Sequence, residues 1–373
     1  MKSFKEKRLI QELLEPTGIK IDGPEPFDIH VHNPAFYPKV LAGGSLALGE
    51  SYMDGWWDCV ALDQFFYRVM RARLDKKVRA SRAALWAGLK ARFFQKTSPR
   101  KAFEIGRRHY DIGNDLFTRM LDRQMNYSCA YWKQADNLDA AQQAKLELIC
   151  RKLMLKEGMR VLDIGCGWGG FAVYAAKNYG VEVVGITVSQ EQVKLARERI
   201  GSLPITIELK DYRDLRERFD RIVSIGMFEH VGLPNYRMYM QSVLGCLNSD
   251  GLFLLHTIGG NASTNTTDSW IGKYIFPNSM LPSASQISAA AEGLLVMEDW
   301  HSFGHYYDRT LMAWYKNLTE NWDQLKSVYD ERFYRMWIYY LLSCAGTFRA
   351  RRNQLWQIVF SNKGIKGGYV SIR

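Results

Sequence analysis

From residue 160 onward, short apolar runs alternate with longer segments in which apolar residues recur every three or four positions. The first pattern is typical of buried strands and the second of amphipathic helices. Alternation of this kind predicts a doubly wound parallel sheet. The predicted strands span residues 160–164, 182–187, 205–208, 221–225, 251–257, 294–300 and 355–360. The predicted helices span residues 137–156, 169–179, 189–200, 236–247, 309–319 and 331–348.

The residues before this core follow a different pattern. Residues 9–14 predict a short helix, residues 27–31 alternate like a strand, and residues 43–57 are dense in glycine and aromatic side chains. We therefore expect a smaller, mainly helical N-terminal domain. Its predicted extent is residues 1–95, followed by a basic linker to about residue 108 and a catalytic domain over residues 109–373.

Asp163 stands near the end of the first predicted strand, and a glycine-rich loop and a helix follow the strand. Glycine lets the backbone come close to a ligand, and the amides at a helix start can bind an anion. The glycines satisfy the dinucleotide pattern G-x-G-x-x-G through Gly165, Gly167 and Gly170. The same loop read from Asp163 through Gly165, Gly167 and Gly169 resembles the first motif of the class I S-adenosylmethionine (AdoMet) methyltransferases. A tight turn without a ligand is the third reading.

The next predicted strand helps to choose between the two cofactors. A dinucleotide site needs an acid at the end of that strand to bind the ribose. The strand over residues 182–187 ends in Thr187 and offers no acid there. This favours AdoMet over NAD.

Polar residues also stand at or just after the ends of several other predicted strands. The carboxyl ends of parallel strands meet at one edge of a sheet, where ligands bind. We therefore expect one converging site. Its strand-end residues are Asp163, Thr187, Asp211, Glu229 and His256.

Composition narrows the setting of the protein. Among the 373 residues, 47% are hydrophobic, which is enough for a full core, and no apolar run is long enough to predict a transmembrane helix. Residues 1–7 are polar and do not look like a secretory signal. The six cysteines lack C-x-x-C spacing, so we expect neither a zinc site nor a disulfide framework, and a reducing cytoplasm.

Positive charge is concentrated in one segment. Residues 68–108 hold 14 Lys or Arg but only two acids, and large apolar side chains are interleaved with them. Such a mixture suits an anionic membrane surface. Nucleic acid is a competing partner, and a solvated linker is the plain alternative. No nucleic-acid-binding motif stands elsewhere in the sequence, which favours lipid.

Several blocks of sequence, in order from about residue 9 to 360, resemble the AdoMet-dependent mycolic-acid and cyclopropane synthases. Within that group the chain is similar to the cyclopropane-fatty-acyl-phospholipid synthases, because the phospholipid-acting enzymes carry the extra N-terminal domain. The resemblance implies a class I AdoMet methyltransferase fold, which is Rossmann-like. The matching blocks are residues 50–57, 127–132, 161–170, 228–232, 254–259, 274–278, 307–311 and 344–349.

The resemblance also implies a reaction. A methylene group passes from AdoMet to the cis double bond of an unsaturated acyl chain in a membrane phospholipid. The alkene attacks the sulfonium methyl group, and the resulting carbocation must lose a proton before the cyclopropane ring closes. In this family a bound bicarbonate acts as general base, and no metal is expected. The residues that match the bicarbonate pocket are Cys129, Glu229, His256, Ile258 and Tyr307.

The AdoMet contacts carry over in the same way. Tyr127 and Ser128 match the carboxylate side, and the three loop glycines match the backbone cradle. The other matches are Thr187 and Gln192 at the ribose, Asp211 and Tyr212 at the adenine, and Asp163 at the glycine turn. Asp163 could instead only cap that turn.

One matched residue has an uncertain role in the chemistry. The late cysteine of this family, Cys344 here, has been proposed as catalytic. Bicarbonate chemistry needs no thiol, however, so a small buried cysteine is the better physical interpretation. Cys344 is kept as a candidate.

Two other functions compete with cyclopropanation. A fatty-acyl C-methyltransferase could use the same pocket, and a lipid-surface binding protein could retain it as a dead site. For the favoured function we expect a cytoplasmic enzyme that associates peripherally with the inner face of the membrane and does not bind nucleic acid. A homodimer is left open.

Overall fold

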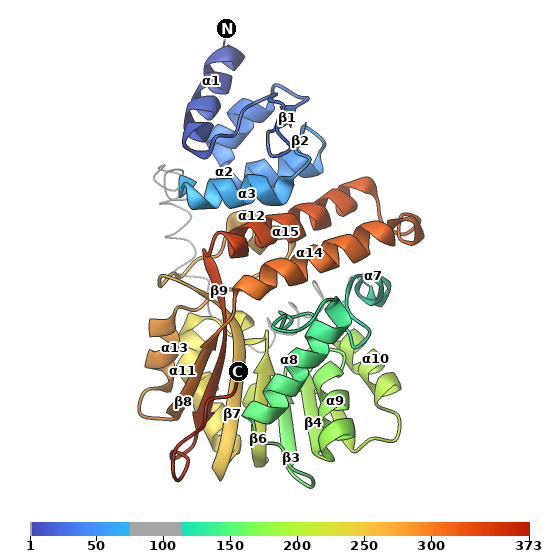
Figure 1. The fold of residues 1–373 in the computed structure, drawn as a ribbon, viewed down its shortest axis with the longest axis vertical. Helices are drawn as coiled ribbons and strands as arrows, with labels where there is room; N and C mark the ends of the chain where they lie inside the picture. The colour runs from blue at the N-terminus through green and yellow to red at the C-terminus, as the bar shows by residue number, and fades with distance from the viewer. Residues whose placement is uncertain (1, 75–112) are drawn as a thin grey trace. The chain divides into compact units, whose positions relative to one another are not determined.

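The computed structural model describes residues 2–74 and 113–373, which fall into two compact units (Figure 1). The first unit combines the N-terminal residues to 94 with residues 266–277 and 307–353. The second unit holds residues 95–265, 278–306 and 354–373.

A seven-stranded sheet forms the centre of the second unit, with strand order β5-β4-β3-β6-β7-β9-β8. The pairs β3–β4, β3–β6, β4–β5 and β6–β7 are parallel. This confirms the predicted α/β class I fold. The strands are β3 (Arg160–Ile164), β4 (Glu182–Thr187), β5 (Ile205–Leu209), β6 (Phe219–Ile225), β7 (Leu247–Gly260), β8 (Val296–Ser302) and β9 (Asn353–Ser361).

One edge of this sheet departs from the parallel prediction. Strand β9 lies between β7 and β8 and runs antiparallel to β8. Neighbouring strands become parallel when a single crossover, usually one helix, joins them. Between β8 and β9 the chain instead forms two long helices, α14 (His305–Glu320) and α15 (Glu331–Arg349).

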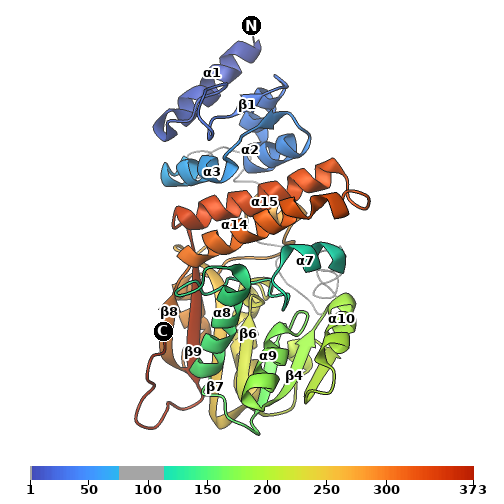
Figure 2. The same ribbon diagram turned by 45° about the vertical axis from the view of Figure 1, so that its right-hand side comes forward.

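Helices cover both faces of the sheet. Successive residues of a strand point to opposite faces, so Val161 packs with α8 and α9, whereas Leu162 packs with α11 and α13. Figures 1 and 2 both show α8 and α9 over the same face. The helices of this unit are α7 (Asn114–Met120), α8 (Leu138–Lys152), α9 (Gly170–Tyr179), α10 (Gln190–Ile200), α11 (Tyr236–Cys246) and α13 (Ala284–Ala291).

The first unit is mainly helical, as predicted for the N-terminal region. Its elements are α1 (Lys2–Leu14), β1 (His30–Val31), α2 (Phe36–Met53), β2 (Trp57–Asp58), α3 (Leu62–Arg71), α12 (Ser269–Tyr274), most of α14, and α15. Arg349 on α15 ties distant segments together, because its guanidinium bonds Asp63 of α3 at 2.6 Å and Asp308 of α14 at 2.8 Å. Packing between α15 and α3 is so close that a Cβ on Gly346 would lie 2.5 Å from the carbonyl oxygen of Asp63.

Some predicted boundaries differ from those observed. Helix α8 ends at Lys152 rather than near Lys156, because Met154 adopts a positive φ of 52° that ends the helix. Between the predicted strands at 251–257 and 294–300, where no element was predicted, β7 continues to Gly260 and the chain forms α12 and α13. The start of α13 carries a capping box from Ser283 and Gln286.

The predicted domain boundary stays a prediction. The junction at residues 95–108 lies outside the described residues, as does most of the basic segment at 68–108. The structure adds that residues 266–277 and 307–353, predicted as part of the catalytic domain, pack with the N-terminal residues. Among the described helices, none has both the length and the apolar character needed to span a bilayer.

Candidate active site

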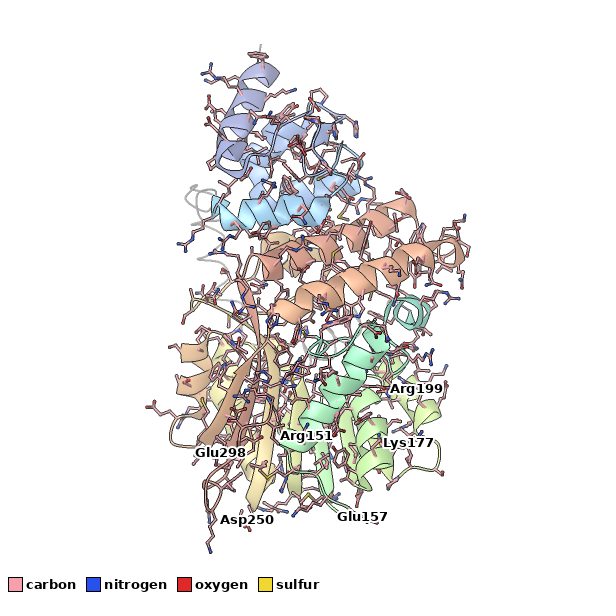
Figure 3. The ribbon with its side chains drawn as sticks, viewed as in Figure 1. Arg151, Glu157, Lys177, Arg199, Asp250 and Glu298 are labelled. Atoms are coloured by element: carbon pink, nitrogen blue, oxygen red, sulfur yellow. The ribbon has the colours of Figure 1, made fainter. Side chains whose placement is uncertain are left out.

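A cavity in the second unit lies at the carboxyl ends of β3, β4 and β6. The opposite edge of the sheet carries ordinary exposed charges, such as Glu157 before β3 and Asp250 near the start of β7 (Figure 3). Nine of the ten residues predicted to bind AdoMet line the cavity. They are Tyr127, Ser128, Asp163, Gly165, Gly167, Thr187, Gln192, Asp211 and Tyr212. The tenth, Gly169, is the N-cap residue of α9. Their binding roles stay predictions.

The glycine loop has a backbone that other residues adopt only with strain. Gly165, Gly167 and Gly169 have φ values of 81°, 55° and 79°. A Cβ on Gly165 would lie 2.8 Å from the Met227 side chain. At Gly167 a Cβ would meet no atom within 4 Å, and this residue lines the cavity. The space beside Gly167 is therefore open to a ligand.

The end of β4 carries a neutral hydrogen-bonded pair in place of an acid. The Thr187 hydroxyl donates to Gln192 Oε1 at 2.7 Å. Ser189 caps α10 by accepting from the Gln192 amide. The Gln192 side chain turns to Thr187 instead of to the Ser189 backbone, so the cap of α10 is not a full capping box. The pair thus faces the cavity as one unit.

Asp211 is held in a fixed orientation by its neighbour. The Arg213 backbone amide and its Nε donate to Asp211 Oδ1 at 3.0 and 2.7 Å, and Nη2 donates to Oδ2 at 2.7 Å. The Tyr212 ring beside it packs edge-on against Tyr239, with centroids 5.0 Å apart. This acid and ring form the side of the cavity predicted for the adenine.

Asp163 is buried against the glycine loop, with its side chain almost fully removed from solvent. Burial raises the pKa of Asp163 to about 7, against the opposing effect of the Lys145 ammonium. Its Oδ1 atom has no hydrogen-bond partner among the described residues. It is thus a strand-end carboxyl with capacity left for a further hydrogen bond.

Lys145 of α8 also lines the cavity, and the sequence interpretation missed it. Its Nζ donates to Ser128 Oγ at 3.1 Å and to Asn126 Oδ1 at 3.2 Å. Gln142, one turn earlier, donates to the Ser128 and Asn126 carbonyl groups at 2.9 and 3.2 Å. The sequence did indicate burial of this lysine, because Lys145 falls on the same helical stripe as the apolar residues Ala141 and Ile149.

Glu229 contacts another of the residues predicted for the bicarbonate pocket. It lies in a short 3₁₀ turn (Phe228–His230), and its Oε1 accepts from the Ile258 amide of β7 at 2.7 Å. Ile258 was itself matched to the bicarbonate pocket, and its amide here positions the Glu229 carboxyl group. Burial raises the pKa of Glu229 to about 7, although the Ile258 amide acts to lower it. Glu229 Oε2 has no hydrogen-bond partner among the described residues.

His256 stands on β7, two residues before Ile258, and is only 1% exposed. Burial lowers the pKa of His256 well below its usual value, so the ring is neutral. The amide Nε2 of Gln357 lies 3.3 Å from its Nδ1, and an N–H donated there leaves the ring proton on Nε2. His256 Nε2 is buried and has no partner in the described part of the chain. Gln357 was not predicted from the sequence.

The remaining candidates fall in different places. Cys129 is fully buried in the second unit, directly after cavity-lining Ser128. Tyr307 belongs to the first unit, where its ring stacks on Phe348 with centroids 4.5 Å apart. Cys344 also belongs to the first unit, and burial raises the pKa of its thiol to about 12. Such a thiol is protonated near neutral pH, which argues against a nucleophile. All three site assignments stay predictions.

Solved structures identify the class of protein that this fold and cavity define. The cyclopropane synthase MmaA2 from Mycobacterium tuberculosis is 32% identical, with a TM-score of 0.66, over 69% of this chain and 97% of its own. The mycolic acid cyclopropane synthase CmaA1, whose structure holds SAH and CTAB, is also 32% identical, with a TM-score of 0.65 over 69% of this chain and 97% of its own. The fold is that of the class I AdoMet-dependent methyltransferases.

Sequence comparison then gives the family. Residues 97–358 match the family model for mycolic acid cyclopropane synthetase. The cyclopropane-fatty-acyl-phospholipid synthase of Escherichia coli K12 is 56% identical over 97% of this chain and 94% of its own length. A probable fatty acid methyltransferase of Pseudomonas putida is 40% identical over 67% of each chain. The chain belongs to the mycolic acid cyclopropane synthetase family and is an AdoMet-dependent enzyme.

Proposed function

We propose that this enzyme transfers a methylene group from AdoMet to the cis double bond of an unsaturated acyl chain in a membrane phospholipid, forming a cyclopropane ring. The observation that carries the proposal is the extent of the match to the Escherichia coli synthase, which covers 97% of this chain. The two mycobacterial structures cover 69%. The phospholipid-acting relative is therefore similar over nearly the whole chain, including most of the N-terminal region.

The cavity residues support AdoMet as the methyl donor. The open space at Gly167 suits a ligand that approaches the backbone closely. The neutral Thr187–Gln192 pair supplies hydrogen-bonding groups where a ribose would lie, and the fixed Asp211 carboxylate suits an amino group of the adenine. Ser128 and Tyr127 line the cavity on the side predicted for the carboxylate of AdoMet.

We further propose that Glu229 and His256 hold a bicarbonate ion. Two buried atoms support this fit, because Glu229 Oε2 and His256 Nε2 both lack partners among the described residues and have complementary roles. Glu229 can accept the O–H of the ion, and the protonated Nε2 of His256 can donate to an oxygen. Bicarbonate, when bound, would supply a general base for the proton that the new methyl group must lose. Glu229 is fixed for this task by the Ile258 amide.

The site assignments of Cys129, Tyr307 and the basic segment are part of the same proposal. The Cys129 amide and the Tyr307 hydroxyl are proposed to donate to bicarbonate. Residues 68–108 are proposed to hold the enzyme on an anionic membrane, since each basic residue near such a surface contributes about 1 kcal/mol. Peripheral attachment at the inner face of the membrane, and assembly as a homodimer, stay predictions.

A fatty-acyl C-methyltransferase is the alternative, and the Pseudomonas putida relative favours it by its description as a probable fatty acid methyltransferase. The two reactions share the methyl transfer and the carbocation. They differ in which proton leaves, since loss from the new methyl group closes a ring and loss from a neighbouring carbon leaves a branched alkene. Both products gain one CH2, so mass alone does not separate them.

The test incubates the enzyme with AdoMet and vesicles of a cis-unsaturated phosphatidylglycerol and phosphatidylethanolamine, then analyses the acyl chains. Cyclopropanation predicts a gain of one CH2, ring-methylene protons in the NMR spectrum, and no uptake of hydrogen under mild catalytic reduction. A reducible branched alkene of the same mass would establish the alternative. Acyl chains of unchanged mass would refute both. Vesicles of neutral phosphatidylcholine with the same acyl chains control for the role of anionic lipid.

A further inference from the structure

Lys145 is a buried cation with no carboxylate in ion-pair contact among the described residues. Burial lowers the pKa of Lys145 to about 8, against the opposing effects of the Asp122 and Asp163 carboxyl groups. Its side chain is 0% exposed, and it lines the cavity described above. Its two hydrogen-bond acceptors, Ser128 Oγ and Asn126 Oδ1, are both uncharged. In the part of the chain that the structure describes, Lys145 forms no ion pair with a carboxylate. The ammonium group therefore has one of its three N–H donors left, at the wall of a cavity.

A second buried lysine on the same helix, Lys152, has a carboxylate of the protein within ion-pair distance. Lys152 is also 0% exposed. Its Nζ lies 3.0 Å from His301 Nδ1 and 3.8 Å from the carboxylate of Asp299. Buried charges are ordinarily paired in this way, because an isolated charge is costly to remove from water. Lys152 has a protein carboxylate within ion-pair distance and Lys145 has none in the described part of the chain, although burial still lowers the pKa of Lys152 to about 7.

We propose that Lys145 binds the carboxylate of the methionine part of AdoMet. The proposal rests on the proposed function, because it takes AdoMet as the ligand of this cavity. A carboxylate would form the ion-pair contact that Lys145 lacks among the described residues and accept the remaining N–H, and charge-assisted hydrogen bonds of this kind are strong. Lys145, Ser128 and Asn126 would then form one wall for the amino-acid end of the ligand.

Bicarbonate is the other anion that Lys145 could meet, and the geometry favours AdoMet. Lys145 and both of its acceptors line the same cavity as Gly165 and Gly167. Glu229 and His256, which are proposed to hold bicarbonate, are not among the residues lining that cavity. The ligand of the glycine loop is thus the one within reach of Lys145.

The experiment compares two ligands that differ only in the carboxylate. Calorimetry measures the affinity of S-adenosylhomocysteine and of its decarboxylated analogue for the wild type and for Lys145→Met, whose side chain is of similar length and uncharged. Wild type should prefer the carboxylate form by about tenfold or more. Lys145→Met should lose most of that preference, with little change for the decarboxylated ligand. Lys152→Met is the matched control, and it should keep the wild-type preference.

Several outcomes would overturn the proposal. An equal loss of affinity for both ligands in Lys145→Met would mean that the lysine only clamps residues 126–128. Unchanged affinities with a lost response to bicarbonate would assign the cation to the other anion. If Lys145→Met does not fold, the wild type decides the question, because equal affinity for the two ligands would exclude a role for any cation at that carboxylate. Wild type that binds neither ligand would refute AdoMet binding itself, which is a separate failure.

Discussion

Two clusters of buried carboxyl groups in the second unit differ in their hydrogen-bond partners and in the direction of their pKa shifts. At the cavity and just beyond it, Asp163 and Glu229 are buried without a cationic partner in hydrogen-bond contact, and burial raises the pKa of each to about 7. On β8, Asp299 receives hydrogen bonds from Arg373 at 2.7 Å and from Ser371 at 2.8 Å. Burial acts to raise the pKa of Asp299, but these bonds outweigh it and the pKa is lowered.

The difference separates groups that stabilise the fold from groups kept for ligands. The Asp299 cluster supplies its own partners, so it stabilises the folded chain whether or not a ligand is bound. Asp163, Glu229 and Lys145 have no oppositely charged partner in hydrogen-bond contact among the described residues, and their burial costs stability that ligands can return. We therefore expect substitutions in the Asp299 cluster to change the stability of the fold. Substitutions among the cavity groups should change ligand binding or turnover.

The largest expected effect is on stability, in Asp299→Asn. This change leaves the Lys152 and Arg373 cations near a neutral amide, and breaking a buried pair costs about 3 kcal/mol or more. Urea unfolding should show this loss, while S-adenosylhomocysteine affinity in the folded variant stays at the wild-type value. Because the folded pKa of Asp299 is lowered below its ordinary value, its contribution is complete above that value. It is lost as pH falls through the folded pKa, and the variant should lack this acid dependence. A variant as stable as wild type would contradict the claim that the Asp299 cluster stabilises the fold.

Next in size is the effect of Glu229→Gln on turnover. It removes the carboxylate proposed to orient bicarbonate, so the rate at saturating AdoMet should fall by about 10²-fold or more. AdoMet affinity should change little, because Glu229 does not line the cavity. Restoring bicarbonate to a degassed assay should rescue wild type and not the variant. Full wild-type activity in bicarbonate-free buffer would exclude the mechanism and make Glu229 itself the first candidate for the base.

The same variant also tests the sign of the pH dependence. The folded pKa of Glu229, about 7, lies above its ordinary value, so the folded state holds this proton more tightly than the unfolded state. Its contribution to stability is therefore present below the ordinary pKa and declines as pH rises through about 7. Glu229→Gln should remove that decline. At fixed bicarbonate concentration, wild-type activity should fall as pH drops below about 7, where the carboxyl becomes protonated.

Gly167→Val should weaken AdoMet binding by about tenfold or more, because a β-branched residue at positive φ is strained and its side chain enters the cavity. Calorimetry on a variant shown to be folded checks this prediction. Gly158→Val is the matched control, since Gly158 also has positive φ and open space but lies outside the cavity. The control should lose stability without losing affinity. Unchanged affinity in Gly167→Val would remove the glycine loop from the site.

The smallest effect is expected for Cys344→Ser. The thiol is protonated near neutral pH, and no step of the proposed reaction uses it. Activity should stay within about threefold of wild type, with a loss of roughly 1 kcal/mol in stability from burying a hydroxyl. A folded Ser variant that does not turn over at saturating AdoMet would restore a chemical role for Cys344.

The sequence predicted best those features that depend on neighbouring residues. β3 and β4 begin and end at the predicted residues, because each is a mainly apolar run that is followed by a turn. What it missed depends on tertiary packing. In the sequence, Lys145 and Gln357 look like ordinary surface residues, but the fold buries both. The Gln192 side chain accepts a hydrogen bond from Thr187 instead of bonding the backbone at the start of its own helix. The antiparallel β9 likewise depends on where a distant helix pair ends.

Segments that pack together in the first unit are synthesised at different times. The bond between Arg349 and Asp63 joins residues that are 286 positions apart. At a synthesis rate of about 5 to 20 residues per second, α3 is synthesised roughly 15 to 60 seconds before the end of α15 that packs against it. During that interval Phe66 of α3, which packs against Tyr339 of α15, lacks that partner, and apolar surface exposed in this way makes a folding chain prone to aggregation. A fragment that ends after the N-terminal segment would stay in that unfinished state.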